Sequence, residues 1–173
     1  TGEAPVYMGF GSMPVLDPER MMRTVATVAG ELKIRVVLSA GWAGLDSVRH
    51  LAGDNVFFVQ AIDHDWLLPR CVAAVHHGGA GTTAAALEAG IPALVCSVFG
   101  DQPFWGVRVT QLGVGTHLPF AKLSEKTLAE GLRAVLREDV RARAAELGVR
   151  LRAEDGTTAT VDAIAAHLGP PRA

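Results

Sequence analysis

The segment from His77 to Thr83 holds the residues best suited to chemistry, because its glycines join a predicted strand to a predicted helix. The first N–H groups of a helix lack partners within the helix, and the helix dipole makes this end positive. A phosphate or diphosphate fits such an environment, and the Thr82 hydroxyl and the His77 ring could donate further hydrogen bonds. The segment lacks the lysine of a Walker A loop. Taken alone, a plain glycine-rich connection with helix-capping threonines fits it equally well.

Short apolar runs alternate with segments of helical spacing along the chain, and these elements must position the glycine-rich segment. Such an alternation is typical of a parallel sheet that is covered on both faces. We therefore predict one doubly wound, Rossmann-like α/β domain over residues 1–173, with about six strands and helices on both faces. The predicted strands are 6–10, 35–39, 56–59, 73–76, 93–96 and 116–118, and the predicted helices are 18–32, 65–68, 83–89, 103–112 and three more after Ser124.

Sheets of this kind bind ligands at the carboxyl ends of their strands. Besides the glycine-rich segment, three strand ends carry small or polar residues, namely Gly11-Ser12, Gly41-Trp42 and Gly100-Asp101-Gln102. We expect the four strand ends to share one cleft.

The composition fits a soluble globular domain, with 49% hydrophobic residues, 20% charged residues and a formal net charge of -2. That charge argues against a nucleic-acid partner, which would favour a basic face. No apolar run reaches the roughly 20 residues of a transmembrane helix, and the first residues do not form a signal peptide. Cys71 and Cys96 lie beside apolar segments and are predicted to be buried free thiols. Together these features predict a cytoplasmic protein.

Three segments resemble the signature of sterol 3β-glucosyltransferases: Asp63 to Pro69, Val75 to Ala85, and Phe99 to Gly106. They are also similar to bacterial antibiotic glycosyltransferases and, more loosely, to the plant secondary-product glycosyltransferase box. His77 and Asp101 are 24 positions apart, the spacing that this box requires between its histidine and its Asp-Gln pair. By this resemblance the chain looks like the C-terminal, donor-binding half of a GT-B fold in the UDP-glycosyltransferase superfamily.

The resemblance implies a role for each matching residue. Contacts to the donor diphosphate are implied for Ser12, His77, Gly79, Gly81 and Thr82. Contacts to the sugar hydroxyls are implied for Asp101 and Gln102, whose carboxylate and amide suit hydroxyl partners.

The chain departs from the plant box in the part that would hold the nucleoside. The box has a tryptophan near positions 59–61 that stacks on the base, whereas this chain has Val59-Gln60-Ala61. We therefore expect backbone groups around Gln60 and Ile62 to contact the base, with Trp42 as a further candidate. The ribose-binding glutamate of the box falls at Ala85, so that contact must come from another residue or be absent.

The resemblance also implies a reaction. Enzymes of this kind transfer a hexose, here expected from UDP-glucose, to a hydroxyl of a lipophilic acceptor and invert the anomeric centre. They need no metal and no cofactor, because the helix N-terminus, His77 and Thr82 would stabilise the leaving diphosphate. The general base belongs to an N-terminal acceptor domain that this sequence does not contain, and the abrupt start at Pro5 suggests a piece of a longer protein. We therefore expect this chain alone to bind the donor without catalysing transfer.

Other interpretations stay open. A dTDP-deoxysugar could replace UDP-glucose, and an isolated donor domain could serve as a non-catalytic binding module. Gly79 to Ala84 also fits a dinucleotide fingerprint, but the next strand ends without the acidic residue that holds the ribose. Asp63-His64-Asp65 spells the D-x-D metal motif of another glycosyltransferase fold, although a cap for the following short helix is the simpler interpretation. His76 is expected to be packed or capping, because it faces away from His77 on the strand.

Overall fold

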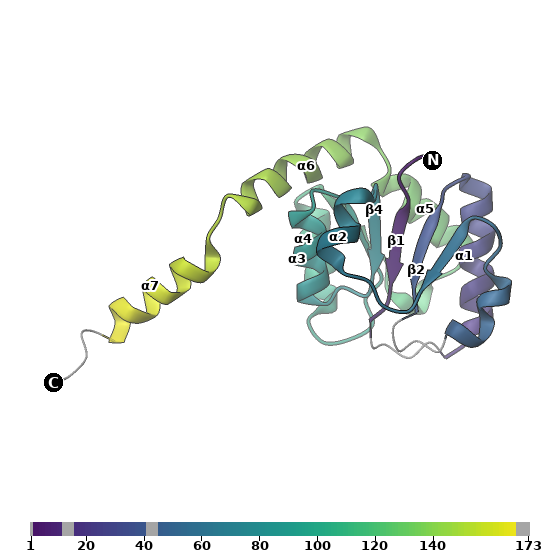
Figure 1. Ribbon diagram of the computed structural model, residues 1–173, viewed down its shortest axis with the longest axis horizontal. Coiled ribbons are helices and arrows are strands. Elements are labelled where there is room, and N and C mark those ends of the chain that lie inside the picture. Colours follow the sequence, from purple (N-terminus) through teal and green to yellow (C-terminus); the bar gives the residue numbers. More distant parts are fainter. Residues whose placement is uncertain (1, 12–15, 41–44, 169–173) are drawn as a thin grey trace.

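The computed structural model describes residues 2–11, 16–40 and 45–168, which include one six-stranded sheet (Figure 1). All pairings are parallel, and the strand order is β3-β2-β1-β4-β5-β6. The strands are β1 (Val6–Gly9), β2 (Val36–Ser39), β3 (Val56–Val59), β4 (Ala73–His76), β5 (Ala93–Val95) and β6 (Gly115–His117). This order is that of a doubly wound Rossmann-like sheet, so the predicted fold class is confirmed.

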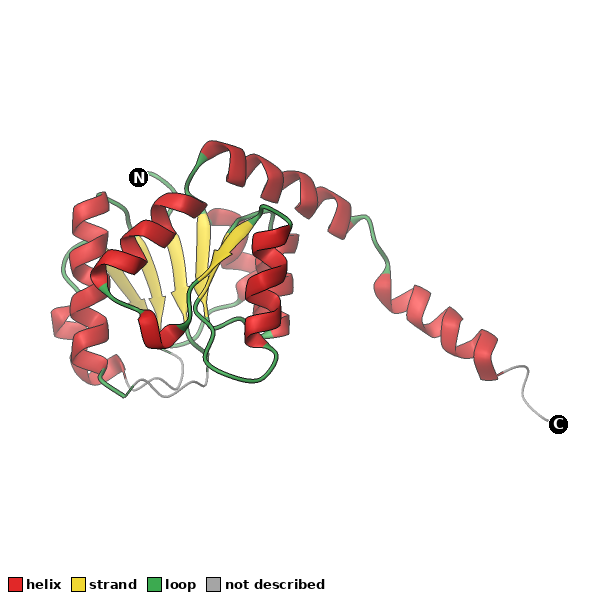
Figure 2. Cartoon of the chain, turned by 180° about the vertical axis from the view of Figure 1, so that it is seen from behind, coloured by secondary structure: helices red, strands yellow, loops and turns green. Residues whose placement is uncertain are grey.

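Helices cover both faces of the sheet (Figures 1 and 2). Seven α-helices are described: α1 (Pro18–Leu32), α2 (His64–Leu67), α3 (Ala80–Glu88), α4 (Gln102–Gln111), α5 (Glu125–Val135), α6 (Glu138–Arg152) and α7 (Gly156–Leu168). Alternate residues of each strand pack on opposite faces. Met8 of β1 belongs to a cluster with Val25 of α1 and Leu132 of α5, whereas Tyr7 belongs to a cluster with Leu67 of α2 and Ala86 of α3.

The start of α1 follows from local sequence. The Asp17 side chain accepts a hydrogen bond from the backbone N–H of Arg20, and proline occupies the first helical position. The helix ends at Leu32 as predicted, with Lys33 in the left-handed conformation at φ 53°. Ser124 caps α5 through a reciprocal capping box with Thr127, which also agrees with the prediction.

Four short elements differ from the sequence prediction. Helix α3 begins at Ala80 rather than Thr83, so the second and third glycines of the segment lie at the cap and in the first turn. Pro69 does not stop the helical turn, because it sits at the start of a 3-10 turn, η2 (Leu68–Arg70), where its missing N–H needs no partner. The 3-10 turns η1 (Leu45–Leu51) and η3 (Phe120–Lys122) were not predicted, since neither has a regular apolar period.

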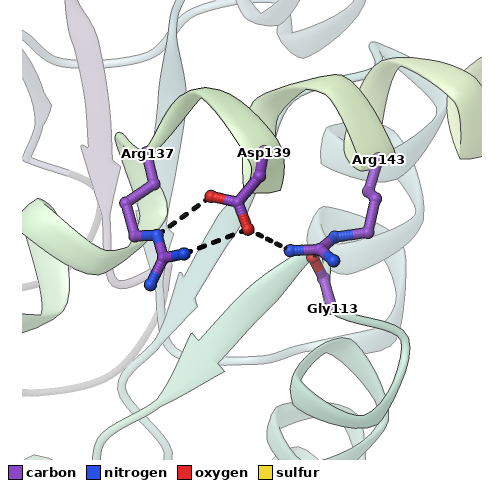
Figure 3. Close-up of polar contacts among 4 residues, drawn as sticks. All are labelled: Gly113, Arg137, Asp139 and Arg143. Carbon is purple, nitrogen blue, oxygen red and sulfur yellow. Dashed lines mark hydrogen bonds and ion pairs between the residues drawn. The ribbon is translucent and has the colours of Figure 1, made fainter.

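The last two helices differ in how they contact the sheet domain. Ala144 and Gly148 of α6 are buried, and a Cβ on Gly148 would lie 2.6 Å from the Cα of Gly90. The first turn of α6 carries an ionic group, in which Asp139 accepts from Arg137 and Arg143 while Arg143 also donates to the Gly113 carbonyl (Figure 3). Helix α7 instead extends away from the sheet (Figures 1 and 2).

Two predictions from composition can be compared with the described residues. Cys71 and Cys96 are both buried and free, as expected. Across the described ranges, no helix combines the length and the apolar character that crossing a membrane requires.

Candidate functional site

The sheet reverses its direction of winding between β1 and β4, and this switch point brings two predicted segments together. Gly11 follows β1 and His77 follows β4, and these two strands are neighbours. Gly11 has a positive φ of 60°, and a Cβ at this position would lie 3.0 Å from Cε1 of His77. Glycine therefore gives the imidazole room to pack directly on the backbone. A switch point of this kind is where open parallel sheets bind ligands.

His77 is held between two glycines and keeps one nitrogen uncommitted. A Cβ on Gly79 would lie 2.6 Å from His77 Nε2, so the ring is confined on that side as well. The Nδ1 atom is buried and has no hydrogen-bond partner among the residues that the structure describes. Burial lowers the pKa of His77, and the nearby carboxylate of Asp101 acts in the opposite direction. The ring is therefore neutral at neutral pH and close to Asp101 across the site.

The N-terminus of α3 faces the same switch point without a side-chain cap. Gly79 is the N-cap residue in extended conformation, and no side chain among the described residues accepts from the first N–H groups. A Cβ on Gly81 would meet no described atom within 4 Å outside its own helix backbone, so the described residues leave the first turn open on that side. The buried Thr83 hydroxyl donates to the Gly79 carbonyl at 2.9 Å, whereas the hydroxyl of the half-buried Thr82 makes no hydrogen bond within the described part of the chain. Of the two threonines, Thr82 keeps its hydroxyl available for a ligand.

The predicted sugar-binding pair lies at the start of α4, but its two members have different surroundings. Asp101 is exposed and accepts a hydrogen bond from the indole N–H of Trp105 at 2.8 Å. Gln102 is only 6% exposed. Its Oε1 accepts from the backbone N–H groups of Val98 and Phe99, at 2.8 Å and 3.2 Å. The amide oxygen of Gln102 therefore holds the loop that presents Asp101, and a direct contact of Gln102 with a sugar remains a prediction.

The predicted nucleoside-binding residues are less well placed. Ser12, implied for the diphosphate, and Trp42, implied for the base, both lie outside the described residues. Gln60 is exposed after β3, and Ile62 is half-buried against the cluster around Tyr7. The structure thus brings His77, Thr82 and Asp101 to one edge of the sheet, and the described residues at this edge do not include Ser12 or Trp42.

The D-x-D motif forms a helix cap, as the simpler interpretation held. The Asp63 side chain accepts from the backbone N–H of Asp65 at 2.9 Å and so caps α2. Within the described ranges, no group of three or more His, Cys, Asp or Glu side chains is placed to hold a metal ion.

Sequence reasoning missed two polar pairs near this edge of the sheet. The Nε2 of His117 lies 2.6 Å from the Ser97 hydroxyl, a contact that we did not predict from the sequence. Strand ends could have indicated that pair, because Ser97 follows β5 and His117 ends the neighbouring β6. Tyr7 contacts His64 at 2.8 Å between Oη and Nε2, and no spacing in the sequence relates these two positions.

Residues 19–168 match the family described as Erythromycin biosynthesis protein CIII-like, C-terminal domain. The chain belongs to this family. Its relatives include the sterol 3-beta-glucosyltransferase UGT80B1 of Arabidopsis thaliana, which is 44% identical over 98% of this chain and 28% of the relative. A sterol 3-beta-glucosyltransferase of Cryptococcus neoformans is 40% identical over 92% of this chain and 11% of the relative. This glycosyltransferase domain therefore spans less than a third of the length of these relatives.

Solved structures agree with this assignment. The calicheamicin glycosyltransferase CalG4 superimposes on the glycosyltransferase domain with a TM-score of 0.76 at 25% identity, covering 96% of this chain and 44% of CalG4. The glycosyltransferase VinC, solved in complex with dTDP, gives a TM-score of 0.75 at 25% identity, covering 92% of this chain and 41% of VinC. The predicted relationship to sterol and antibiotic glycosyltransferases is confirmed.

Proposed function

We propose that this chain binds the diphosphate of a nucleotide sugar, preferably UDP-glucose, at the switch point between β1 and β4. The observation that carries the proposal is the convergence of His77 with the uncapped start of α3, opposite the glycine that follows β1. Unpaired N–H groups, a positive helix end and the half-buried imidazole of His77 together suit a diphosphate. The sterol glucosyltransferase names of the relatives support glucose as the sugar.

The proposed chemistry is an inverting displacement. An acceptor hydroxyl attacks the anomeric carbon, the bond from that carbon to the diphosphate oxygen breaks, and the electron pair of this bond stays on the diphosphate. The first N–H groups of α3, the His77 ring and the Thr82 hydroxyl would stabilise the charge that develops there, without a metal. The proton of the acceptor hydroxyl passes to a base that we expect on a separate acceptor domain. The acceptor is proposed to be lipophilic, either a sterol or a polyketide-like compound.

Calorimetry of this chain against UDP, dTDP, UDP-glucose and UDP-N-acetylglucosamine tests the proposal. We expect UDP and UDP-glucose to bind, and we expect His77→Ala to lose about tenfold in affinity, as is typical for a hydrogen bond to a charged group. His50→Ala is a matched control, because His50 is an exposed histidine of η1. Unchanged affinity in the His77 variant would refute the assignment of the diphosphate site. Glucosyl transfer to a sterol by this chain alone would refute the expectation that it only binds the donor.

A dTDP-sugar is the second candidate donor, because VinC was solved in complex with dTDP. The same titrations decide between the candidates. Tighter binding of dTDP than of UDP would favour a deoxysugar donor and an acceptor like those of antibiotic glycosyltransferases.

A further inference from the structure

His76, the last residue of β4, makes a backbone contact that the proposed chemistry does not use. Its side chain is completely buried. Its Nδ1 accepts a hydrogen bond from the backbone N–H of Gly78 at 3.0 Å, within the interior. A ring nitrogen that accepts carries no hydrogen, so the proton of the neutral ring is on Nε2.

The contact fixes the turn at the start of the glycine-rich segment from His77 to Thr83. Gly78 has a φ of +92°, a backbone conformation that residues other than glycine rarely adopt. A Cβ here would lie 2.6 Å from Cγ1 of Val95 and 3.1 Å from the carbonyl oxygen of Gln102. Gly78 is thus held from one side by the His76 ring and from the other by β5 and the start of α4.

The surroundings of Nε2, the other ring nitrogen, show why a histidine differs here from an apolar residue. His76 Nε2 is buried and has no hydrogen-bond partner in the part of the chain that the structure describes. A buried donor without a partner destabilises the fold. A leucine would fill a similar volume without that cost, but it could not accept from Gly78. The contact from Nδ1 is therefore the property that distinguishes histidine from an apolar residue at this position.

We infer that His76 is a positioning residue for the diphosphate, because it holds the Gly78 turn that aims His77 and the start of α3 at the switch point. The inference rests on the proposed function for the identity of the ligand. The ring of His76 lies 6.5 Å from that of His77 between centroids, so it acts through the backbone of the turn and does not replace His77.

Two substitutions separate this role from simple packing. His76→Asn places an amide oxygen close to the position of Nδ1, whereas His76→Leu provides no acceptor. We expect His76→Leu to bind UDP about tenfold more weakly, and His76→Asn to stay within about twofold of the unsubstituted chain. His117→Leu is the control, since it removes another histidine contact, to Ser97, without touching Gly78, and it should leave UDP affinity unchanged.

Hydrogen exchange of the Gly78 amide provides a readout that needs no nucleotide. Protection of this amide should be lost in His76→Leu and kept in His76→Asn. If the unsubstituted chain binds neither UDP nor dTDP, the proposed function fails, while the exchange measurement still tests the hold on the turn. Equal affinities of the leucine variant and the unsubstituted chain would overturn the inference, and so would an asparagine variant as weak as the leucine variant. If His76→Leu does not fold, His76→Gln takes its place. The glutamine oxygen lies one bond further from the backbone than Nδ1 does, so it is misplaced for the Gly78 N–H.

Discussion

His76 and His77 are adjacent in the chain but have different surroundings. His76 is completely buried, and burial lowers its pKa to about 3, with His77 and His64 nearby acting in the same direction. His77 is half-buried at the edge of the sheet, and its pKa is lowered by burial while Asp101 opposes the shift. The first histidine is thus a neutral structural acceptor, and the second is a polar group that a ligand can reach.

The buried histidine makes stability depend on pH. In the unfolded chain His76 binds a proton near its ordinary pKa of 6.5, whereas in the folded chain its pKa is about 3. The unfolded state therefore takes up more protons between these values, and the free energy of unfolding falls as pH falls from 6.5 towards 3. The contribution of this group is at most about 1.36 kcal/mol per pH unit.

Urea denaturation across this pH range measures the effect. His76→Asn removes the titrating group, so its unfolding free energy should decline less steeply with acidification than that of the unsubstituted chain. His117→Asn serves as the comparison, because burial also lowers the pKa of His117, but in a less buried place. Parallel pH profiles for His76→Asn and the unsubstituted chain would contradict the assignment.

At the scale of elements, alanine substitutions at two glycines of the glycine-rich segment should change the stability of the chain in opposite directions. Gly78→Ala forces a Cβ to within 2.6 Å of Val95 at a φ of +92°, and we expect a loss of about 2–4 kcal/mol in unfolding free energy. Gly81→Ala adds a Cβ that meets nothing within 4 Å in the first turn of α3, and alanine favours helix by up to about 1 kcal/mol. The second variant should therefore be as stable as the unsubstituted chain or more so.

Nucleotide binding should separate the same pair of variants in another way. Gly81→Ala places a methyl group where the open first turn would meet the phosphates, so weaker UDP binding is expected despite unchanged or higher stability. Thermal denaturation with and without UDP measures both effects in one experiment. A Gly81→Ala chain that binds UDP normally would show that the phosphates do not approach this turn.

The sequence predicted the sheet well because most of its strands are short, largely apolar runs that alternate with segments of helical spacing. Strands β3 and β4 have the predicted bounds, and α1 begins and ends where its cap and its last apolar residue indicated. The predicted start of α3 was three residues too late. Glycine has a low helix propensity, so the sequence favoured a start after Gly81, whereas the structure has Gly81 in the first turn.

The site was predicted less completely than the fold. His77 and Asp101 could be brought together because each follows a predicted strand, and the carboxyl ends of parallel strands lie at one edge of the sheet. The role of Gln102 in holding its own loop depends on backbone N–H groups, whose positions no residue pattern encodes. The same reason hid the contact between His76 and Gly78.

At the scale of the whole molecule, the two C-terminal helices should contribute unequally to stability. The described side chains of α7 are exposed, including Val161 at 58% and Ile164 at 53%, whereas α6 buries Ala144 and Gly148 next to α3. Removing residues 156–173 should change the unfolding free energy by no more than about 0.5 kcal/mol. Removing residues 138–173 should cost more than about 2 kcal/mol, because it also uncovers α3. Equal losses in the two truncations, measured by urea denaturation, would contradict this division.

The packing of Gly78 against the Gln102 carbonyl joins the two loops of the proposed site. One loop would hold the diphosphate, and the other presents Asp101. Because they are tied together before any ligand arrives, ordering one of them also orders the other, and little further conformational entropy is lost when the sugar is present. In an enzyme built on this domain, contacts to the sugar would then add to donor affinity at little entropic cost, so UDP would bind more weakly than the intact donor. Transfer of the sugar would therefore favour the release of UDP.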